Sequence, residues 1–393
     1  MKILITTEWY TPTVNGVITS IINLKEILTD MGHEVRILTL SEKASAHIDE
    51  EQGLYAMSSY GVGKIYPGAR VALTMDDDVL SHILDWNPDI VHTQCEFSTF
   101  RIARRISQIL TIPIVHTYHT VYEDYTHYFS PNKKWGKKAV AVFSKRVLNH
   151  SDAVIAPTNK VESLLKGYKV NQPVHVIPTG LDLEKFNQAL TQKEIVTLRR
   201  SLSIPDDCSV LVSVGRVAKE KNLEEIISYL KELDDPKLRL LVVGDGPYRE
   251  TLETFIDEID ARAFVVFAGM VAPENIATYY QLGDVFVSAS TSETQGLSYI
   301  EALASGVFAL CRKDDCLIDV IEDGENGFQY TTYDEFRSSL YTLLTHADFN
   351  TVKKQAAQNK IEETYSIEAF GKSVEMVYLE AIRNHTHQHV FSL

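Results

Sequence analysis

Short apolar runs alternate with longer amphipathic stretches along most of the chain. In the first half, the runs that predict β-strands are residues 2–6, 34–40, 90–94, 113–118, 153–158 and 174–178. The stretches with apolar positions at helical spacing are residues 17–32, 99–110 and 137–150. This alternation is typical of parallel sheets whose two faces are both covered by helices. It predicts an α/β, doubly wound, Rossmann-like fold.

The same cycle restarts after about residue 185. Strands are expected at residues 210–215, 238–244, 264–269, 284–290 and 307–311, and helices at 223–233, 248–259, 274–282 and 297–305. A chain of 393 residues also exceeds the length at which one hydrophobic core keeps growing. We therefore expect two tandem domains, residues 1–185 and 186–393, with the junction near Thr179 to Asp182.

The last predicted helix, residues 366–384, has no strand after it and can cap either domain, so it can cross back to the first. Ligands of open parallel sheets bind beyond the carboxyl ends of the strands. Two such domains facing one another would hold substrates in the cleft between them.

Charge narrows the possible partners. The formal net charge of −15 argues against nonspecific binding to nucleic acid, which needs a basic surface. The charge is uneven, because residues 101–150 hold 9 Lys and Arg against 2 Asp and Glu. This basic block includes the stretch 122–138, which is rich in both aromatic residues and lysine.

Cysteine usage and the chain start bear on location. The four cysteines include no CxxC pair, which indicates a reducing compartment. The start, MKILITTEW, predicts a buried strand and not a signal peptide, and no apolar run approaches the ~20 residues that span a bilayer. We expect a cytoplasmic protein, or one on a membrane surface that does not cross it.

The strongest chemical signal is the run from Ser292 to Glu301, at a predicted strand–loop–helix transition. Backbone N–H groups at the start of this helix can hold a phosphate. Glu293 would lie in the loop and Glu301 about two turns into the helix. Alternatively, Glu293 caps the helix and Glu301 faces solvent.

A second signal lies at the end of the strand 210–215. Gly215 and Arg216 follow it, and Lys221 comes five residues after Arg216. Two cations at the carboxyl end of a strand, together with a helix N-terminus, form a consistent site for a diphosphate. The alternative is that Arg216 and Lys221 are ordinary surface charges.

With these motifs the sequence resembles the retaining nucleotide-sugar glycosyltransferases of the GT-B fold, in the group with glycogen synthases and phosphatidylinositol mannosyltransferases. The resemblance covers nearly the whole chain. It rests on the Glu293/Glu301 pair, Gly215-Arg216 with Lys221, Gly244-Asp245-Gly246-Pro247, Asn15-Gly16-Val17, and His119 after a strand.

The resemblance implies a role for each matched position. The residues implied in catalysis are His119 near the donor sugar, Arg216 and Lys221 on the diphosphate, and Glu293 on the sugar hydroxyls. The residues implied in donor binding are Gly16, Val17, Gly215, Gly244, Thr294, Gln295, Gly296, Leu297, Ser298 and Glu301, the last on the nucleotide ribose. One departure is Gln295, where many members have Phe, and it bears on donor preference.

Cofactor patterns are weak. Residues 244–246 lack the third glycine of a dinucleotide motif, because Arg249 stands there, and residues 76–78 are better placed to start a helix than to bind metal. No ligand completes a zinc site for His116, His119 and His127. We expect no prosthetic group and no essential metal, with a UDP-sugar as donor substrate. The tail histidines His385, His387 and His389 are expected to be solvated.

The aromatic and basic stretch follows His119 and is expected on the acceptor side. Its candidate acceptor and membrane residues are Tyr122, Tyr125, Tyr128, Phe129, Lys133, Lys134, Trp135, Lys137 and Lys138. Helical spacing would place Lys134, Lys138 and Lys145 on one side, and Ala139, Val140, Phe143 and Val147 on the buried side. Basic segments flanked by Trp and Tyr bind anionic lipid surfaces. An ordinary surface helix is the alternative.

This stretch, the loop that begins at Asn15 and the loop at Gln295 are also similar to bacterial diacylglycerol α-glucosyltransferases. That similarity implies transfer of glucose from UDP-glucose to the 3-hydroxyl of diacylglycerol, giving α-monoglucosyldiacylglycerol at the inner membrane surface. The rival interpretations are another donor, such as UDP-galactose or GDP-mannose, and a soluble or different lipid acceptor. A protein that binds nucleotide sugars without catalysis is a more distant alternative.

Overall fold

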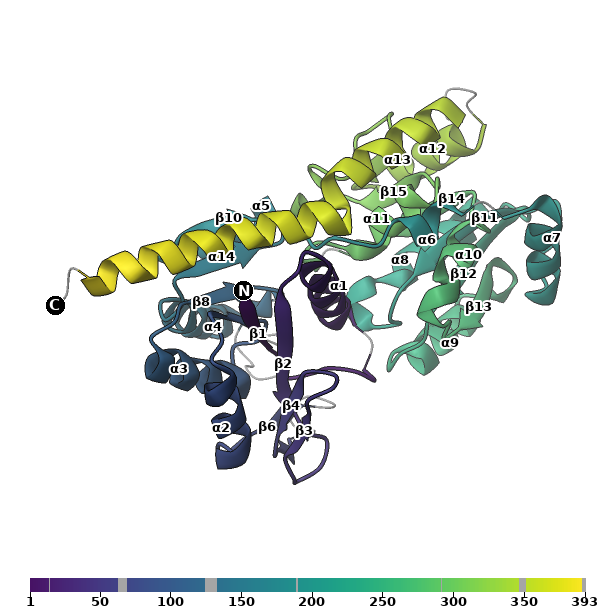
Figure 1. Cartoon of the computed structure of the whole chain (residues 1–393). Coiled ribbons are helices and arrows are strands. Elements are labelled where there is room, and N and C mark those ends of the chain that lie inside the picture. Colours follow the sequence, from purple (N-terminus) through teal and green to yellow (C-terminus); the bar gives the residue numbers. More distant parts are fainter. Residues whose placement is uncertain are drawn as a thin grey trace. The chain divides into compact units, whose positions relative to one another are not determined.

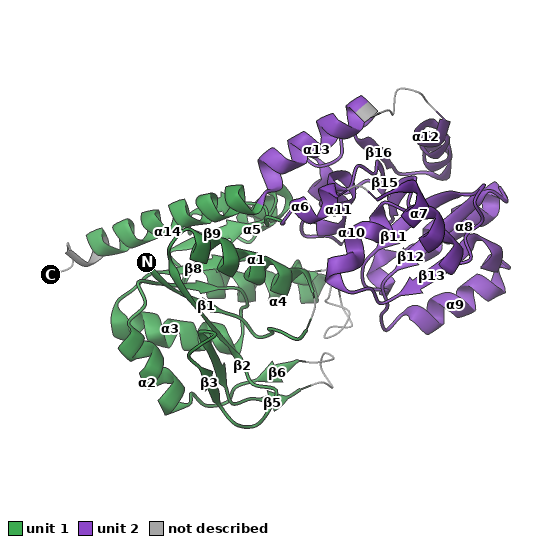
Figure 2. Ribbon diagram, turned by 45° about the vertical axis from the view of Figure 1, so that its right-hand side comes forward, with its two compact units in different colours: residues 1–181, 367–393 green, residues 182–366 purple. Residues whose placement is uncertain are grey.

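The chain forms two compact α/β units. The computed structural model describes residues 1–13, 15–62, 69–123, 133–188, 190–290, 292–345 and 351–390. One unit comprises residues 1–181 with 367–393, and the other residues 182–366 (Figure 2). The units part between Leu181 and Asp182, a few residues before the expected domain boundary after residue 185.

The sheet of the first unit is parallel except at one edge. Within the described residues, its order is β10 (Val174–Val176), β9 (Ala153–Ala156), β8 (Ile114–Thr117), β7 (Ile90–Thr93), β1 (Lys2–Thr6), β2 (Glu34–Leu40), β4 (Leu54–Met57) and β3 (His47–Asp49). The antiparallel pair is β3 with β4. A separate small hairpin pairs β5 (Tyr60–Gly61) with β6 (Arg70–Val71).

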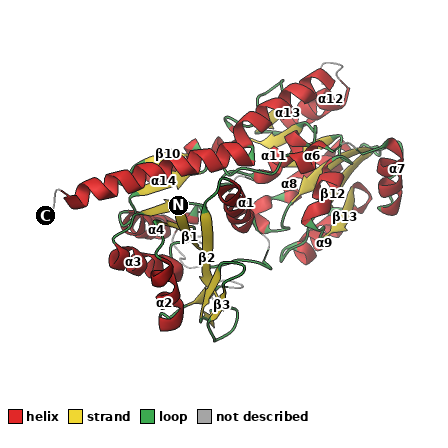
Figure 3. Ribbon diagram, viewed as in Figure 1, coloured by secondary structure: helices red, strands yellow, loops and turns green. Residues whose placement is uncertain are grey.

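Helices cover both faces of this sheet (Figures 1 and 3). They are α1 (Gly16–Asp30), α2 (Asp77–Trp86), α3 (Ser98–Leu110), α4 (Lys133–Leu148), α5 (Asn159–Gly167) and α14 (Ile367–Val390). Along β1, Ile3 and Ile5 pack with α1 and α14, whereas Leu4 packs on the opposite side with α2 and α3. This alternation is what a strand buried on both faces requires.

The last helix, α14, packs on the first unit although the chain reaches it from the second. Phe370, Val374 and Tyr378 lie in the same core cluster as residues of α1. Gly371 makes this approach possible, because a Cβ atom there would lie 2.7 Å from Cγ1 of Ile27.

The second unit repeats the architecture. Within the described residues its strands are parallel in the order β13 (Val265–Gly269), β12 (Leu238–Val243), β11 (Ser209–Val214), β14 (Val285–Ser288), β15 (Ala309–Arg312) and β16 (Gly327–Tyr330). Its helices are α6 (Glu184–Asn187), α7 (Gln192–Ser201), α8 (Leu223–Leu233), α9 (Arg249–Glu258), α10 (Ile276–Tyr280), α11 (Leu297–Ala304), α12 (Tyr333–Thr345) and α13 (Thr351–Tyr365). The expected fold, two doubly wound sheets, is confirmed.

Some elements were not expected from the apolar pattern. The polar stretch after residue 187 contains α7, whose start is a capping box in which Thr191 and Glu194 bond each other's backbone. Residues 76–78 do start a helix, since α2 begins at Asp77. Asp76 itself accepts hydrogen bonds from the backbone and side chain of Ser58.

A buried carboxyl group caps α3. The N–H of Thr99, in the first turn, donates to Oε1 of Glu8 at 2.8 Å, and Glu8 follows β1. Burial raises the pKa of Glu8 to about 7, although the Thr99 N–H opposes this rise. The folded chain therefore keeps a proton on Glu8 up to about pH 7, whereas the unfolded chain loses it near its ordinary pKa of 4.5.

We expect Glu8→Gln to become stabilising as the pH rises. Because the folded pKa is raised, wild-type stability falls between the two pKa values, while the amide of the variant stays neutral and still accepts from Thr99. The free energy of unfolding of the variant, relative to wild type, should rise by on the order of 2 kcal/mol from pH 5 to pH 8. Urea unfolding measures this, with exposed Glu26→Gln on α1 as the control. An equal difference at both pH values would contradict the assignment.

Candidate functional site

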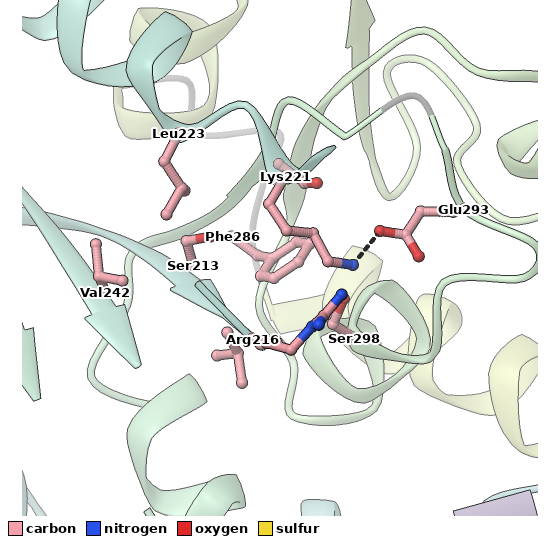
Figure 4. A pocket seen from close by; sticks show the side chains of 11 residues that line it. Ser213, Arg216, Lys221, Leu223, Val242, Phe286, Glu293 and Ser298 are labelled. Atoms are coloured by element: carbon pink, nitrogen blue, oxygen red, sulfur yellow. Dashed lines mark hydrogen bonds and ion pairs between the residues drawn. The ribbon is translucent and has the colours of Figure 1, made fainter. Parts of the chain in front are cut away.

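A pocket lies at the carboxyl ends of β11 and β14 in the second unit. Figure 4 shows the side chains around it, and Lys221 points toward Glu293. The lining residues are Ser213, Val214, Gly215, Arg216, Lys221, Leu223, Val242, Phe286, Ser288, Glu293 and Ser298. The structure thus brings together the Gly215–Lys221 and Glu293–Ser298 segments.

The position of Arg216 depends on close packing of two loops. Gly244 follows β12 with φ of 127°, and a Cβ atom there would lie 2.0 Å from the carbonyl oxygen of Gly215. Val217 donates to the carbonyl of Asp245 at 3.0 Å across the same contact. The absence of a side chain at Gly244 therefore has a packing reason, whether or not this residue also contacts a ligand.

Both candidate phosphate-binding cations contact carboxylates. Arg216 Nη2 donates to Glu220 Oε1 at 2.5 Å, and Lys221 Nζ donates to Glu293 Oε1. The Lys221–Glu293 pair is largely enclosed, with side chains 31 % and 15 % exposed. An incoming diphosphate would exchange or share these partners. Glu220 was not predicted, although its place four residues after Arg216 was a signal for an ion pair.

The loop before α11 packs against an aromatic side chain, that of Tyr299. Gly296, the residue before the helix, has φ of 75°, and a Cβ atom there would lie 2.4 Å from the ring of Tyr299. The first turn of α11 carries the N–H groups of Leu297 and Ser298, which have no partner within the helix. In the same loop, Gln295 is buried and Thr294 half-buried. The expected anion-binding helix start is thus beside the two cations.

Glu301 does not line this pocket. It lies on α11, where its Oε2 accepts a hydrogen bond from the hydroxyl of Tyr280 at 2.6 Å. Burial raises the pKa of Glu301. Glu301 is therefore a half-buried, hydrogen-bonded residue and not a fully solvated one, and of the two glutamates only Glu293 lines the pocket.

The remaining predicted residues of the donor site belong to the first unit. Gly16 is exposed in the first turn of α1, and Val17 is half-buried beside the core. Asn15 caps this helix, since its Oδ1 accepts from the N–H of Ile18 at 3.0 Å. Such a start leaves other N–H groups of the first turn without helical partners.

His119 follows β8 and is held as a neutral imidazole. Its Nε2 lies 2.6 Å from Oε1 of Gln94, so Nε2 carries the proton and Nδ1 keeps its lone pair. Burial, with nearby His116, lowers the pKa of His119 to about 3. At neutral pH its ring adds no positive charge near the carboxyl end of the sheet.

An acidic group beside His116 was missed. Glu96 is buried, its Oε1 lies 3.3 Å from Nε2 of His116, and its Oε2 accepts from the hydroxyl of Tyr122. Its position just after β7 was the available signal, because polar residues after parallel strands gather at one edge of the sheet. Tyr122 thus points inward, toward Glu96.

The buried face of α4 differs from the predicted one. Val140 and Val147 are buried as expected, but Ser144 is buried too, within 3.0 Å of the hydroxyl of Tyr118. Ala139 is exposed and Phe143 is 38 % exposed, so their predicted burial was wrong. Because Ser144 contacts the buried Tyr118, the helix turns a different face toward the core from the face that its apolar residues alone predict.

The exposed face of α4 is consequently both apolar and basic. Trp135 is 72 % exposed and Val142 69 % exposed, with exposed Lys134, Lys138 and Arg146 among them. Lys138 Nζ lies 5.9 Å from the ring centre of Trp135.

The other predicted residues of this stretch differ in what they contact. Lys137 Nζ donates to Glu123 Oε2 at 2.6 Å, so it is engaged within the unit. Tyr125, Tyr128 and Phe129 lie outside the described residues, as does the side chain of Lys133.

The histidines considered earlier take different places. His385 is paired with Asp152 at 2.9 Å, so the expectation that it is solvated was wrong. His387 is exposed, while His127 and the side chain of His389 lie outside the described residues. Among the residues that the structure describes, no group of three or more His, Cys, Asp or Glu could hold a metal ion.

Comparison with known proteins identifies the family. The family model described as Glycosyltransferase Family 4 matches residues 14–185, and that described as Glycosyl transferases group 1 matches residues 194–360. An alpha-monoglucosyldiacylglycerol synthase of Streptococcus pneumoniae is 36 % identical, over 99 % of this chain and 88 % of that protein. One of Acholeplasma laidlawii is 31 % identical, over 97 % of this chain and 98 % of that protein.

Solved structures share the fold at low sequence identity. Sucrose-phosphate synthase from Thermosynechococcus elongatus has a TM-score of 0.79 at 18 % identity, covering 98 % of this chain and 99 % of that one. Anabaena HepE, solved with UDP and glucose, has a TM-score of 0.76 at 17 % identity, covering 97 % and 100 %. With the two family matches and the full-length relatives, this chain belongs to the nucleotide-sugar-dependent glycosyltransferases of the GT-B fold.

Proposed function

We propose that the protein is a retaining α-glucosyltransferase. It would move glucose from UDP-glucose to the 3-hydroxyl of 1,2-diacylglycerol and form α-monoglucosyldiacylglycerol at the cytoplasmic face of the membrane. The observation that carries the transfer chemistry is the pocket where Arg216, Lys221 and the start of α11 meet. The acceptor is proposed from the two full-length relatives, which are named for this product.

The pocket suits a leaving diphosphate. When the bond between the anomeric carbon and the phosphate oxygen breaks, its electron pair leaves with UDP, and negative charge grows on the diphosphate. Arg216, Lys221 and the N–H groups of Leu297 and Ser298 would stabilise that charge without prior rearrangement of solvent. They are the proposed source of most of the rate acceleration.

Retention needs no nucleophile of the enzyme in this proposal. The acceptor oxygen would bond to the anomeric carbon on the face that UDP leaves, and its proton would pass to the departing phosphate oxygen. Glu293 would accept hydrogen bonds from the sugar hydroxyls once Lys221 turns to the phosphate. We also propose roles in donor binding for Gly16, Val17 and neutral His119.

Diacylglycerol resides in membranes, and the exposed face of α4 offers a means of contact. Trp135 and Val142 would enter the interfacial region, while Lys138 and Arg146 would meet anionic headgroups. None of the helices in the described part of the chain is both long enough and apolar enough to cross a membrane. We therefore propose peripheral binding at the cytoplasmic face.

Removing either cation should slow the transfer step. Arg216→Ala or Lys221→Ala should each lower kcat by about 100-fold or more, comparable to losing one preorganised donor worth about 3 kcal/mol. Turnover with UDP-glucose and diacylglycerol in mixed vesicles measures this.

Arg262→Ala and Lys231→Ala are matched controls, because each removes a similarly exposed cation that contacts a carboxylate away from the pocket. They should leave turnover close to wild type. Near-wild-type turnover of the Arg216 and Lys221 variants would refute the diphosphate site.

Changing the exposed face of α4 should weaken membrane binding. Lys138→Glu with Arg146→Glu should lower the affinity for anionic vesicles by at least about tenfold, since each basic residue near such a surface contributes about 1 kcal/mol. Trp135→Ala should weaken binding to anionic and neutral vesicles alike.

Vesicle flotation measures both effects. The control is the double variant Lys193→Glu with Arg200→Glu on α7, which changes the net charge of the protein by the same amount at a different helix. If the α4 and α7 variants float equally well, the proposed contact is wrong.

A donor panel tests the function as a whole. UDP-glucose, UDP-galactose and GDP-mannose are offered with diacylglycerol in anionic vesicles, and with soluble sugars. We expect α-glucosyldiacylglycerol from UDP-glucose, identified by mass spectrometry and by the anomeric proton in NMR. Transfer from another donor, or to another acceptor, would replace this proposal. Nucleotide-sugar binding with no transfer at all would favour a non-catalytic role.

A further inference from the structure

A row of aromatic side chains crosses the core of the second unit beside α11. Phe186, Tyr280, Phe286 and Tyr299 follow one another with ring centres 6.1, 5.9 and 5.5 Å apart. Tyr280 and Tyr299 are completely buried. Each phenol hydroxyl has a specific partner, Glu301 for Tyr280 and Ser288 for Tyr299.

Tyr280 holds one oxygen of the Glu301 carboxylate. The bond from its hydroxyl to Oε2 is 2.6 Å long, and no hydrogen bond to Oε1 is found within the described part of the chain. Burial raises the pKa of Tyr280 well above its ordinary value, so the phenol stays protonated and can only be the donor to a carboxylate. One carboxylate oxygen is fixed while the other remains available to a ligand.

The ring of Tyr280 is itself firmly placed. Tyr280 is the last residue of α10. The turn that follows lies so close to β11 that a Cβ atom at Gly283 would be 2.4 Å from Val212 Cγ1. The neighbouring Gln281 donates to the carbonyl of Gln188 at 2.7 Å and accepts from the N–H of Leu190 at 2.8 Å. A side chain held in this way can set the direction of its partner.

We propose that Tyr280 is a positioning residue that orients Glu301 to accept hydrogen bonds from the ribose hydroxyls of the donor nucleotide. The inference rests on the proposed function in that the donor is a nucleotide sugar, and on the contact between Glu301 and the ribose that the family resemblance implies; the new element is the role of Tyr280. It does not depend on which sugar or acceptor is used. A purely structural Tyr280 would instead support the core of the unit and affect all ligands alike.

The test compares two ligands that differ only in the ribose hydroxyls. Calorimetry gives the Kd of UDP and of 2′,3′-dideoxy-UDP for wild type, Tyr280→Phe and Glu301→Gln. Tyr330→Phe is the matched control, because this buried tyrosine donates to another glutamate of the unit, Glu225, at 3.0 Å.

We expect wild type to bind UDP about tenfold or more tightly than the dideoxy form, and this preference to fall about three- to tenfold in Tyr280→Phe. The affinity for dideoxy-UDP should not change. Glu301→Gln should lose the preference as well, and Tyr330→Phe should keep it.

Three results would overturn the inference: wild type without a ribose preference, Glu301→Gln with the full preference, or Tyr280→Phe in which both ligands weaken by the same factor. Even if Tyr280→Phe folds poorly, a full ribose preference in Glu301→Gln overturns the inference. If the protein binds UDP with a ribose preference but transfers no sugar, the proposed function is wrong and this inference still holds.

Discussion

The site in the second unit depends on one close backbone contact, that of Gly244 with the carbonyl of Gly215. The loops after β11 and β12 lie so near each other that a Cβ atom at Gly244 would be 2.0 Å from the Gly215 oxygen. Because Gly244 has none, the two loops can pack this closely, with Arg216 lining the pocket. A side chain there would push the loops apart, and the cation would move with the backbone that carries it.

Charge compensation is the second organising feature. Arg216 contacts Glu220, and Lys221 contacts Glu293, so each cation is held by a carboxylate. A partly buried charge without a partner is costly, and these contacts avoid that cost until an anion arrives.

The polar edge of the sheet in the first unit has a different chemistry. There, Glu96 contacts the imidazole of His116 and the phenol of Tyr122, a chemistry that suits hydroxyl groups better than phosphates.

Much of the fold follows from sequence because strand and helix patterns are local. A strand buried on both faces is a short apolar run, and β1, β7 and β11 were found for that reason. Helix α7 was missed because no part of it is buried, and only its capping box between Thr191 and Glu194 marks it. The wrong face assigned to α4 has a tertiary cause, since Ser144 is buried against Tyr118, a residue on another element.

For the site, the sequence by itself determined which residues follow the strands: Arg216 and Lys221 after β11, Glu293 after β14, and His119 after β8. Such assignments need only the element boundaries and the rule that ligands bind at the carboxyl ends of parallel strands. Only the tertiary structure decided the partners, because these are distant in sequence. Lys221 is 72 residues from Glu293, and Tyr280 is 21 residues from Glu301. No periodicity encodes such pairs; the first arises where strands of one sheet bring their ends together, and the second where helices α10 and α11 pack against each other.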